Sequence, residues 1–158
     1  WDLQLMRTWY RAHNTSAVQY VFSGEGGLFV AGRWNHKGRK VIHCSNSISL
    51  CTLEWLAHNG LSVSGYSYFK FEINVPYSLV KSFTITDMPK DWEKTPSSNN
   101  TRDFSEEHLF NQNKYLAISV PSVMVPEEYN LVINPLHKDM EAVTHSISLL
   151  GKYTSPQR

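Results

Sequence analysis

Apolar and polar positions along the chain follow the two-residue period of a strand in some segments and helical spacing in others. The clearest strand covers residues 68–75 and ends at Pro76. Shorter apolar runs predict further strands over residues 5–11, 40–45, 115–120 and 131–133. In residues 68–75 the alternation is typical of a half-buried strand, with Phe69, Phe71, Ile73 and Val75 on one face and Tyr68, Lys70, Glu72 and Asn74 on the other.

Helices are predicted where capping residues precede apolar positions at helical spacing. Residues 45–47 can cap a helix over residues 48–58, and Gly60 is well placed to end it. Ser105 can cap a second, short helix that runs to about residue 111. A final amphipathic helix that covers the sheet is predicted by the helical spacing of Met140, Val143, Ile147 and Leu150.

These elements predict a single domain of the α+β class over residues 1–158, with a compact mixed sheet core and flanking helices. The length and the 41% apolar composition suffice for one good core. Residues 94–101 are rich in Ser, Asn and Thr, and we expect a mobile surface loop there rather than a domain linker. The pattern leaves the pairing of the strands open.

Charge and cysteine content narrow the function classes. The net charge of +1 comes from scattered Lys and Arg without a basic stripe, which argues against direct nucleic-acid binding. Cys44 and Cys51 form neither a disulfide framework nor a CxxC zinc motif, so we expect a reducing, cytoplasmic location. Long apolar segments are missing, which argues against a membrane span. The first residue is Trp rather than Met, which suggests a trimmed chain.

The segment from Gly32 to Gly38, read as GRWNHKG, and the downstream Glu54 carry the most suggestive chemistry. On a helix, Glu54 shares a mostly apolar stripe, so its carboxylate either lies against the core or reaches water at the edge of the stripe. Arg11 and Arg33 each have aromatic neighbours, a combination that suits a nucleotide. Alternatively, both arginines are surface charges and the neighbouring Trp9 and Trp34 are core residues.

Other catalytic motifs are missing. The early glycines lack the Lys-Ser/Thr of a phosphate loop and are more simply turn residues. The seven histidines show no HExxH or short paired spacing, so we expect no metal. Without a GxSxG elbow, Ser122 considered alone is an ordinary serine at the end of a strand.

The linked motifs, in their order and spacing, resemble the RES domain family, which is named for an arginine, a glutamate and a serine. The resemblance runs from Tyr10 to about Pro135. It rests on Tyr10-Arg11, Gly32-Arg33-Trp34-Asn35 with Gly38, residues 41–45, Leu53-Glu54 with His58, residues 120–123 and residues 130–135.

The resemblance implies a fold like that of ADP-ribosyltransferases and a toxin that destroys NAD+ at its nicotinamide-ribose bond, by hydrolysis or phosphorolysis. NAD+ would be the substrate, with no separate cofactor. The partner would be a cognate antitoxin with a DNA-binding domain, and a homodimer through the final apolar helix is plausible.

Carried over by position, the family's catalytic arginine, glutamate and serine fall on Arg11, Glu54 and Ser122. Glu54 would stabilise the positively charged ribose and orient the attacking water or phosphate, and Arg11 would grip the pyrophosphate or ribose. Ser122 would hydrogen-bond the nicotinamide-side ribose or the carboxamide. Arg33 would be a second phosphate clamp or the cation beside Glu54.

The remaining expected substrate-binding residues are Trp34, Asn35 and His43, with Trp34 or His43 stacking on a ring. The chain departs from the family at His43, eleven residues before Glu54, where a tyrosine is usual. It also has residues 102–104 in place of a Gly-Asp-Trp-like segment. The alternative function is a non-catalytic nucleotide-binding module or an RNA-directed toxin that uses its histidines, neither of which needs Glu54 or Ser122.

Overall fold

The computed structural model describes residues 5–60 and 65–155. Within them, seven strands form one sheet in the order β4-β5-β6-β2-β1-β3-β7. Neighbouring strands are antiparallel except β4 and β5, which are parallel. The strands are β1 (Met6–His13), β2 (Ile42–Ser45), β3 (Ser67–Pro76), β4 (Val80–Ser82), β5 (Ala117–Pro121), β6 (Tyr129–Ile133) and β7 (Ser148–Thr154).

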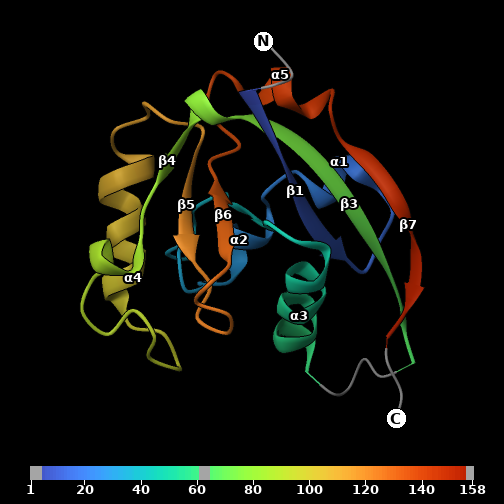
Figure 1. Ribbon diagram of the computed structural model, residues 1–158, viewed down its shortest axis with the longest axis horizontal. Helices are drawn as coiled ribbons and strands as arrows, with labels where there is room; N and C mark the ends of the chain where they lie inside the picture. The colour runs from blue at the N-terminus through green and yellow to red at the C-terminus, as the bar shows by residue number, and fades with distance from the viewer. Residues whose placement is uncertain (1–4, 61–64, 156–158) are drawn as a thin grey trace.

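Helical segments flank this sheet. Figure 1 shows the long strands β1, β3 and β7 curving together on one side and the shorter β4, β5 and β6 on the other. The α-helices are α1 (Val18–Val21), α2 (Gly26–Phe29), α3 (Ile48–Asn59), α4 (Asn99–Ser105) and α5 (Met140–Thr144). The shorter turns are the 3-10 helices η3 (Tyr77–Leu79) and η4 (Ile85–Asp87) and the π-helix η5 (Glu106–Phe110). None of these helices has the length and apolar character needed to cross a membrane.

The predicted helix after residue 47 is confirmed as α3, because its start and stop signals are local. The Ser47 hydroxyl accepts a hydrogen bond from the Leu50 amide at 3.0 Å, and Gly60 follows the last turn with a φ of 71° that favours glycine. Leu50, Cys51 and Trp55 are its buried residues. The helix packs against β1 and β2, which fixes the direction in which its other side chains face.

Two apolar clusters hold the fold together. The larger one gathers around the β1–β3 side of the sheet and includes Trp9, Phe71 and Ile73. The second lies between β5, β6 and the α4–η5 segment and includes Phe104 and Leu109. Cys44 and Cys51 are both buried free thiols.

The predicted final helix is wrong. Helical spacing continues from Met140 to Leu150, but α5 ends at Thr144 and residues 148–154 form β7. This strand pairs with β3 at the edge of the sheet, a long-range interaction that overrides the local pattern. The apolar final helix expected as a dimer surface is therefore absent, and Leu149 and Leu150 are exposed on β7 instead.

The predicted short helix to about residue 111 is present as η5, but Ser105 at its N-cap position makes no capping hydrogen bond with its side chain. Ser105 is also the last residue of α4, a helix that Ser98 caps by accepting a hydrogen bond from the Asn100 amide. The predicted loop over residues 94–101 therefore ends three residues earlier, at Ser98. Thr101 is fully buried and donates a hydrogen bond to the Arg33 carbonyl, so this part of the segment belongs to the core.

The predicted strand over residues 68–75 is confirmed as β3, but its second face is not simply polar and exposed. Tyr68 is 3% exposed because the Trp55 indole of α3 stacks on it, with 4.2 Å between ring centres. The Lys70 ammonium lies 4.2 Å from the centre of the Tyr153 ring. Near the start of β3 this second face is thus covered by Trp55 of α3 and by the Tyr153 side chain of the neighbouring strand β7.

Candidate active site

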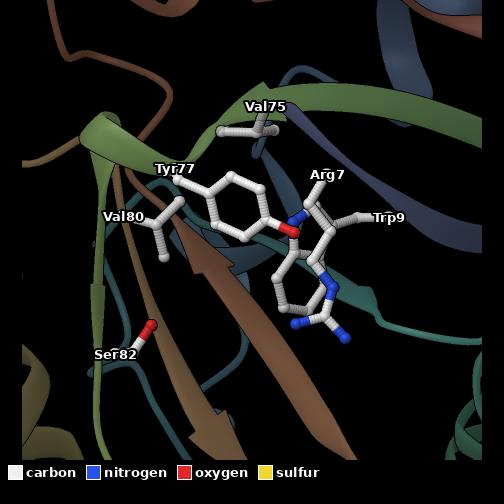
Figure 2. Close-up of a pocket in the computed structure, with 6 residues that line it drawn as sticks. All are labelled: Arg7, Trp9, Val75, Tyr77, Val80 and Ser82. Carbon is white, nitrogen blue, oxygen red and sulfur yellow. The ribbon is translucent and has the colours of Figure 1, made fainter. Parts of the chain in front are cut away.

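A cleft of about 830 Å³ opens between α3, β1, the α1–α2 segment and the loop that carries Arg33. This volume lies in the range of small-molecule sites. A second cavity, shown in Figure 2, measures only about 20 Å³ and lies between Arg7, Trp9, Tyr77 and neighbouring side chains. It is large enough for about one water molecule. The larger cleft is therefore the candidate site, and Arg11, Arg33, His43 and Glu54 all line it.

Glu54 is held from two sides by hydrogen bonds to one carboxylate oxygen. Its Oε1 accepts a hydrogen bond from the Asn130 side-chain amide at 2.8 Å and another from the Ser122 hydroxyl at 3.1 Å. Among the described residues, Oε2 has no hydrogen-bond partner. Because the side chain is half-buried and lines the cleft, Glu54 can present this oxygen to a ligand.

Ser122 contacts Glu54, as its place in the motif set suggests, but it does not line the cleft. Its side chain is fully buried, and its oxygen accepts hydrogen bonds from the amides of Met124 and Val125, both at 3.2 Å. All of its hydrogen-bonding capacity is thus used within the protein. We therefore assign Ser122 to holding Glu54 rather than to binding a ribose or a carboxamide directly.

Arg11 joins two backbone segments beneath the cleft. Its Nε donates to the Val21 carbonyl and its Nη1 to the His43 carbonyl, both at 2.9 Å. Burial lowers the pKa of the guanidinium, and the nearby Cys44 opposes that shift. Among the described residues, Nη2 has no hydrogen-bond partner, which leaves one edge of this cleft-lining cation for an anion.

Arg33 is largely engaged with the segment before α4. Its Nη1 donates to the carbonyls of Trp92 and Lys94, both at 2.8 Å, and its Nη2 donates to the Thr95 hydroxyl at 3.3 Å. Burial lowers its pKa, while the charge of Glu54 acts in the opposite direction. Arg33 is thus a supporting cation near Glu54 and an anchor for residues 92–95.

Trp34 and Asn35 have structural roles. Trp34 borders the cleft but is only 4% exposed, and it meets Phe104 edge-on in the second core cluster. Asn35 is 2% exposed. Its amide braces the loop by donating to the Val30 carbonyl and accepting from the Gly32 amide. Both residues border the cleft, so their expected contacts with the substrate stay a prediction.

Histidines line one end of the cleft. His43 is half-buried, and burial together with the charges of Arg11 and His58 lowers its pKa to about 4. The same three causes lower the pKa of His13 to about 4. Both imidazoles are therefore neutral at pH 7. No group of three potential metal ligands occurs within residues 5–60 and 65–155.

Asn130 and Ser45 were not identified as site residues from the sequence. They lie directly opposite each other in the β2–β6 ladder, and the Ser45 hydroxyl donates to the Asn130 side-chain oxygen at 2.8 Å. Asn130 belongs to one of the recognised motifs, but its contact with Glu54 depends on a strand register that local pattern leaves open. Knowledge that β2 pairs with β6 would have placed Asn130 opposite Ser45, beside the start of α3.

Comparisons with known proteins identify the family. The RES domain model matches residues 8–153. "Toxin Res" of Yersinia enterocolitica serotype O:8 is 33% identical over 94% of this chain and 97% of its own length. The "Prs ADP-ribosylating toxin" of a Sphingobium species, strain YBL2, is 32% identical over 77% of this chain and 76% of its own length.

A solved structure shares the fold. It is described as a crystal structure of the M. tuberculosis MbcT-MbcA toxin-antitoxin complex, and its matching chain superposes with a TM-score of 0.66 at 18% identity. The match covers 94% of this chain and 84% of the other. The predicted α+β fold class is confirmed.

Proposed function

The chain belongs to the RES domain family, and from this membership and the geometry of the cleft we propose that it is a toxin that cleaves NAD+. The observation that carries the proposal is the Glu54 carboxylate, which two donors hold by one oxygen while the other stays available in the cleft. Relatives named as toxins, one of them ADP-ribosylating, support the choice of substrate.

The bond to be broken joins C1′ of the ribose to the nicotinamide nitrogen. Its electron pair leaves with nicotinamide, which departs neutral, so positive charge develops on the ribose. An anion fixed beside that charge stabilises the transition state more than the ground state. Glu54 Oε2 supplies the anion, and it can also orient the incoming nucleophile.

Arg11 provides the complementary cation. Its Nη2 is directed to the pyrophosphate or ribose of the substrate, while its other donors hold the Val21 and His43 carbonyls. Arg33 adds positive charge from the opposite loop. In this arrangement NAD+ is the substrate, and no separate cofactor or metal is required because the leaving group already carries the positive charge.

We further propose that an antitoxin with a DNA-binding domain covers the cleft and neutralises the activity. The relatives carry the name toxin, and the solved structure with this fold is described as a toxin-antitoxin complex. Because a toxin of this kind acts on the NAD+ pool of the cell, we place it in the cytoplasm.

The test is to incubate the purified protein with NAD+ and to identify the products by mass spectrometry, with and without inorganic phosphate. We expect nicotinamide together with ADP-ribose if water is the acceptor, or ADP-ribose-1-phosphate if phosphate is. Intact NAD+ alongside degraded RNA would overturn the proposal in favour of an RNA-directed toxin. Of the lysines and arginines in the described chain, only Arg11 and Arg33 line the cleft, too few to follow a nucleic-acid backbone.

A further inference from the structure

We propose that Asn130, oriented by Ser45, is a positioning residue that holds the Glu54 carboxylate for the reaction, an inference that rests on the proposed function. Asn130 lies on β6 and Ser45 at the end of β2, where the two residues face each other in the ladder. Ser45 is 3% exposed. Two hydrogen bonds of 2.8 Å run in series, from the Ser45 hydroxyl to Asn130 Oδ1 and from Asn130 Nδ2 to Glu54 Oε1.

Ser45 and Glu54 together set the direction in which the Asn130 amide faces, because the hydroxyl can donate to its oxygen while the carboxylate can only accept from its nitrogen. The amide has a donating end and an accepting end, and only the donating end stabilises a carboxylate. Since the Ser45 hydroxyl donates to Oδ1, the opposite end, Nδ2, turns toward Glu54. A flipped amide would place its oxygen against the negatively charged carboxylate and lose the hydrogen bond to Glu54, whereas the Ser45 hydroxyl could still accept from Nδ2.

The second donor to Glu54 Oε1 comes from a different strand end. Ser122 follows β5, whereas Asn130 belongs to β6, so two neighbouring segments of the sheet hold a carboxylate that α3 supplies. Two donors on one oxygen restrict rotation of the carboxylate. This arrangement leaves Oε2 as the oxygen that faces the reacting ribose, and it does so before substrate binds.

Contacts at the start of α3 support the same alignment. The Asn46 amide donates to the Tyr129 carbonyl at 3.0 Å, and the Ser47 hydroxyl donates to Glu128 Oε1 at 2.5 Å. The beginning of the helix is therefore attached to the same stretch, residues 128–130, that carries the amide. Helix and strand cannot shift relative to each other without disturbing both these contacts and the hydrogen bond to Glu54.

The experiment compares NAD+ cleavage by wild type, Asn130→Asp and Ser45→Ala. Asp has nearly the volume of Asn but lacks the amide donor. For Asn130→Asp we expect kcat to fall at least about tenfold, because the change removes a hydrogen bond to a charged group and places a second carboxylate beside Glu54, with KM changed by less than about threefold. Ser45→Ala should lower kcat by a smaller factor, because the amide can still adopt the required orientation.

The matched control is Asn74→Asp. Asn74 lies on β3, outside the cleft, and its side-chain oxygen accepts a hydrogen bond from the Thr8 hydroxyl, a bond that Asp can keep. We expect its kcat to stay within about twofold of wild type. If Asn130→Asp keeps the wild-type kcat, or changes KM rather than kcat, the positioning role is wrong.

A measurement without turnover separates this inference from the proposed function. The side-chain amide signal of Asn130 in a ¹⁵N-correlated NMR spectrum should shift in both Glu54→Gln and Ser45→Ala, and stay in place in Asn74→Asp. If the Asn130 signal shifts in neither variant, the positioning role of Asn130 is wrong, even if the enzyme is active. If the wild-type protein does not cleave NAD+ but the Asn130 signal shifts as expected, the NAD+ proposal is wrong, whereas the hydrogen bonds from Ser45 through Asn130 to Glu54 are supported.

Discussion

Replacing Ser122 with Ala distinguishes a serine that contacts NAD+ from one that acts only through Glu54. The position by itself suggests a substrate contact, whereas in the structure the hydroxyl is buried and engaged with Glu54, Met124 and Val125. We predict that Ser122→Ala lowers kcat about tenfold, because Glu54 keeps the stronger, shorter hydrogen bond from Asn130.

The same change also lowers stability. Removing the hydroxyl takes a donor from Glu54 and an acceptor from two partly buried amides. Leaving such groups unpaired costs about 1–3 kcal/mol, so the free energy of unfolding should fall by roughly that amount. Urea denaturation measures this loss and confirms that the variant is folded under assay conditions.

The decisive assay measures NAD+ binding without turnover, by calorimetry in a Glu54→Gln background. Glutamine keeps an oxygen that can accept from Ser122, so the geometry is retained while the charge is removed. We predict that adding Ser122→Ala changes the Kd for NAD+ by less than about twofold, as should Ser119→Ala, a buried serine of β5 outside the cleft. A Kd weakened about tenfold or more by Ser122→Ala alone would mean that the hydroxyl contacts the substrate and would refute this reasoning.

Three further predictions follow from individual contacts. Arg33→Ala removes three hydrogen bonds to residues 92–95 and should lower the free energy of unfolding by about 1–3 kcal/mol. Limited proteolysis should then cut this segment faster than in wild type, and an unchanged cleavage rate would contradict the anchoring role of Arg33. Trp34→Phe should leave the Kd for NAD+ within about twofold in the Glu54→Gln background, since only 4% of Trp34 is exposed at the edge of the cleft. A clear loss of affinity would instead support the expected stacking role of Trp34. The unfolded chain protonates His43 near pH 6.5 but the folded protein only near its pKa of about 4, so stability is lost as pH falls through that window. His43 should account for about 2 kcal/mol of the loss between pH 7.5 and 5. Urea titrations at both pH values should show a smaller loss of unfolding free energy for His43→Gln than for wild type, and an unchanged loss for the exposed control His145→Gln. The same dependence of unfolding free energy on pH in wild type and both variants would contradict the role of His43.

Elements defined by neighbouring residues could be predicted from the sequence. The helix α3 follows from the Ser47 cap and the Gly60 stop, signals that act within a turn of the chain. The segment after Thr144 could not be predicted in this way, because apolar residues at helical spacing there are drawn into an edge strand by pairing with β3. Local spacing indicates which secondary structures a segment can form, and pairing within the sheet determines which of them it adopts.

The candidate site likewise has features that the sequence predicts and others that depend on the packing of distant segments. The sequence brings Glu54, Ser122 and Arg11 into one hypothesis, and the structure joins the first two by a hydrogen bond across 68 residues. The sequence alone cannot reveal that the Ser122 side chain faces inward or that Asn130 is the second hydrogen-bond donor to Glu54. Both depend on how β5 and β6 lie beside α3. The burial of Trp34 could not be predicted for a related reason, since an aromatic residue beside an arginine has the same local sequence in a core and in a binding site.

The most direct test of the central claim is the rate of nicotinamide release from NAD+ by Glu54→Gln, measured beside wild type and Glu25→Gln. Glu25 also lines the cleft but is exposed and has no contact with Ser122 or Asn130. We predict that Glu54→Gln lowers kcat by about a thousandfold and that Glu25→Gln stays within about threefold of wild type. A Glu54→Gln protein that releases nicotinamide at the wild-type rate would contradict the assignment of Glu54 as the catalytic anion.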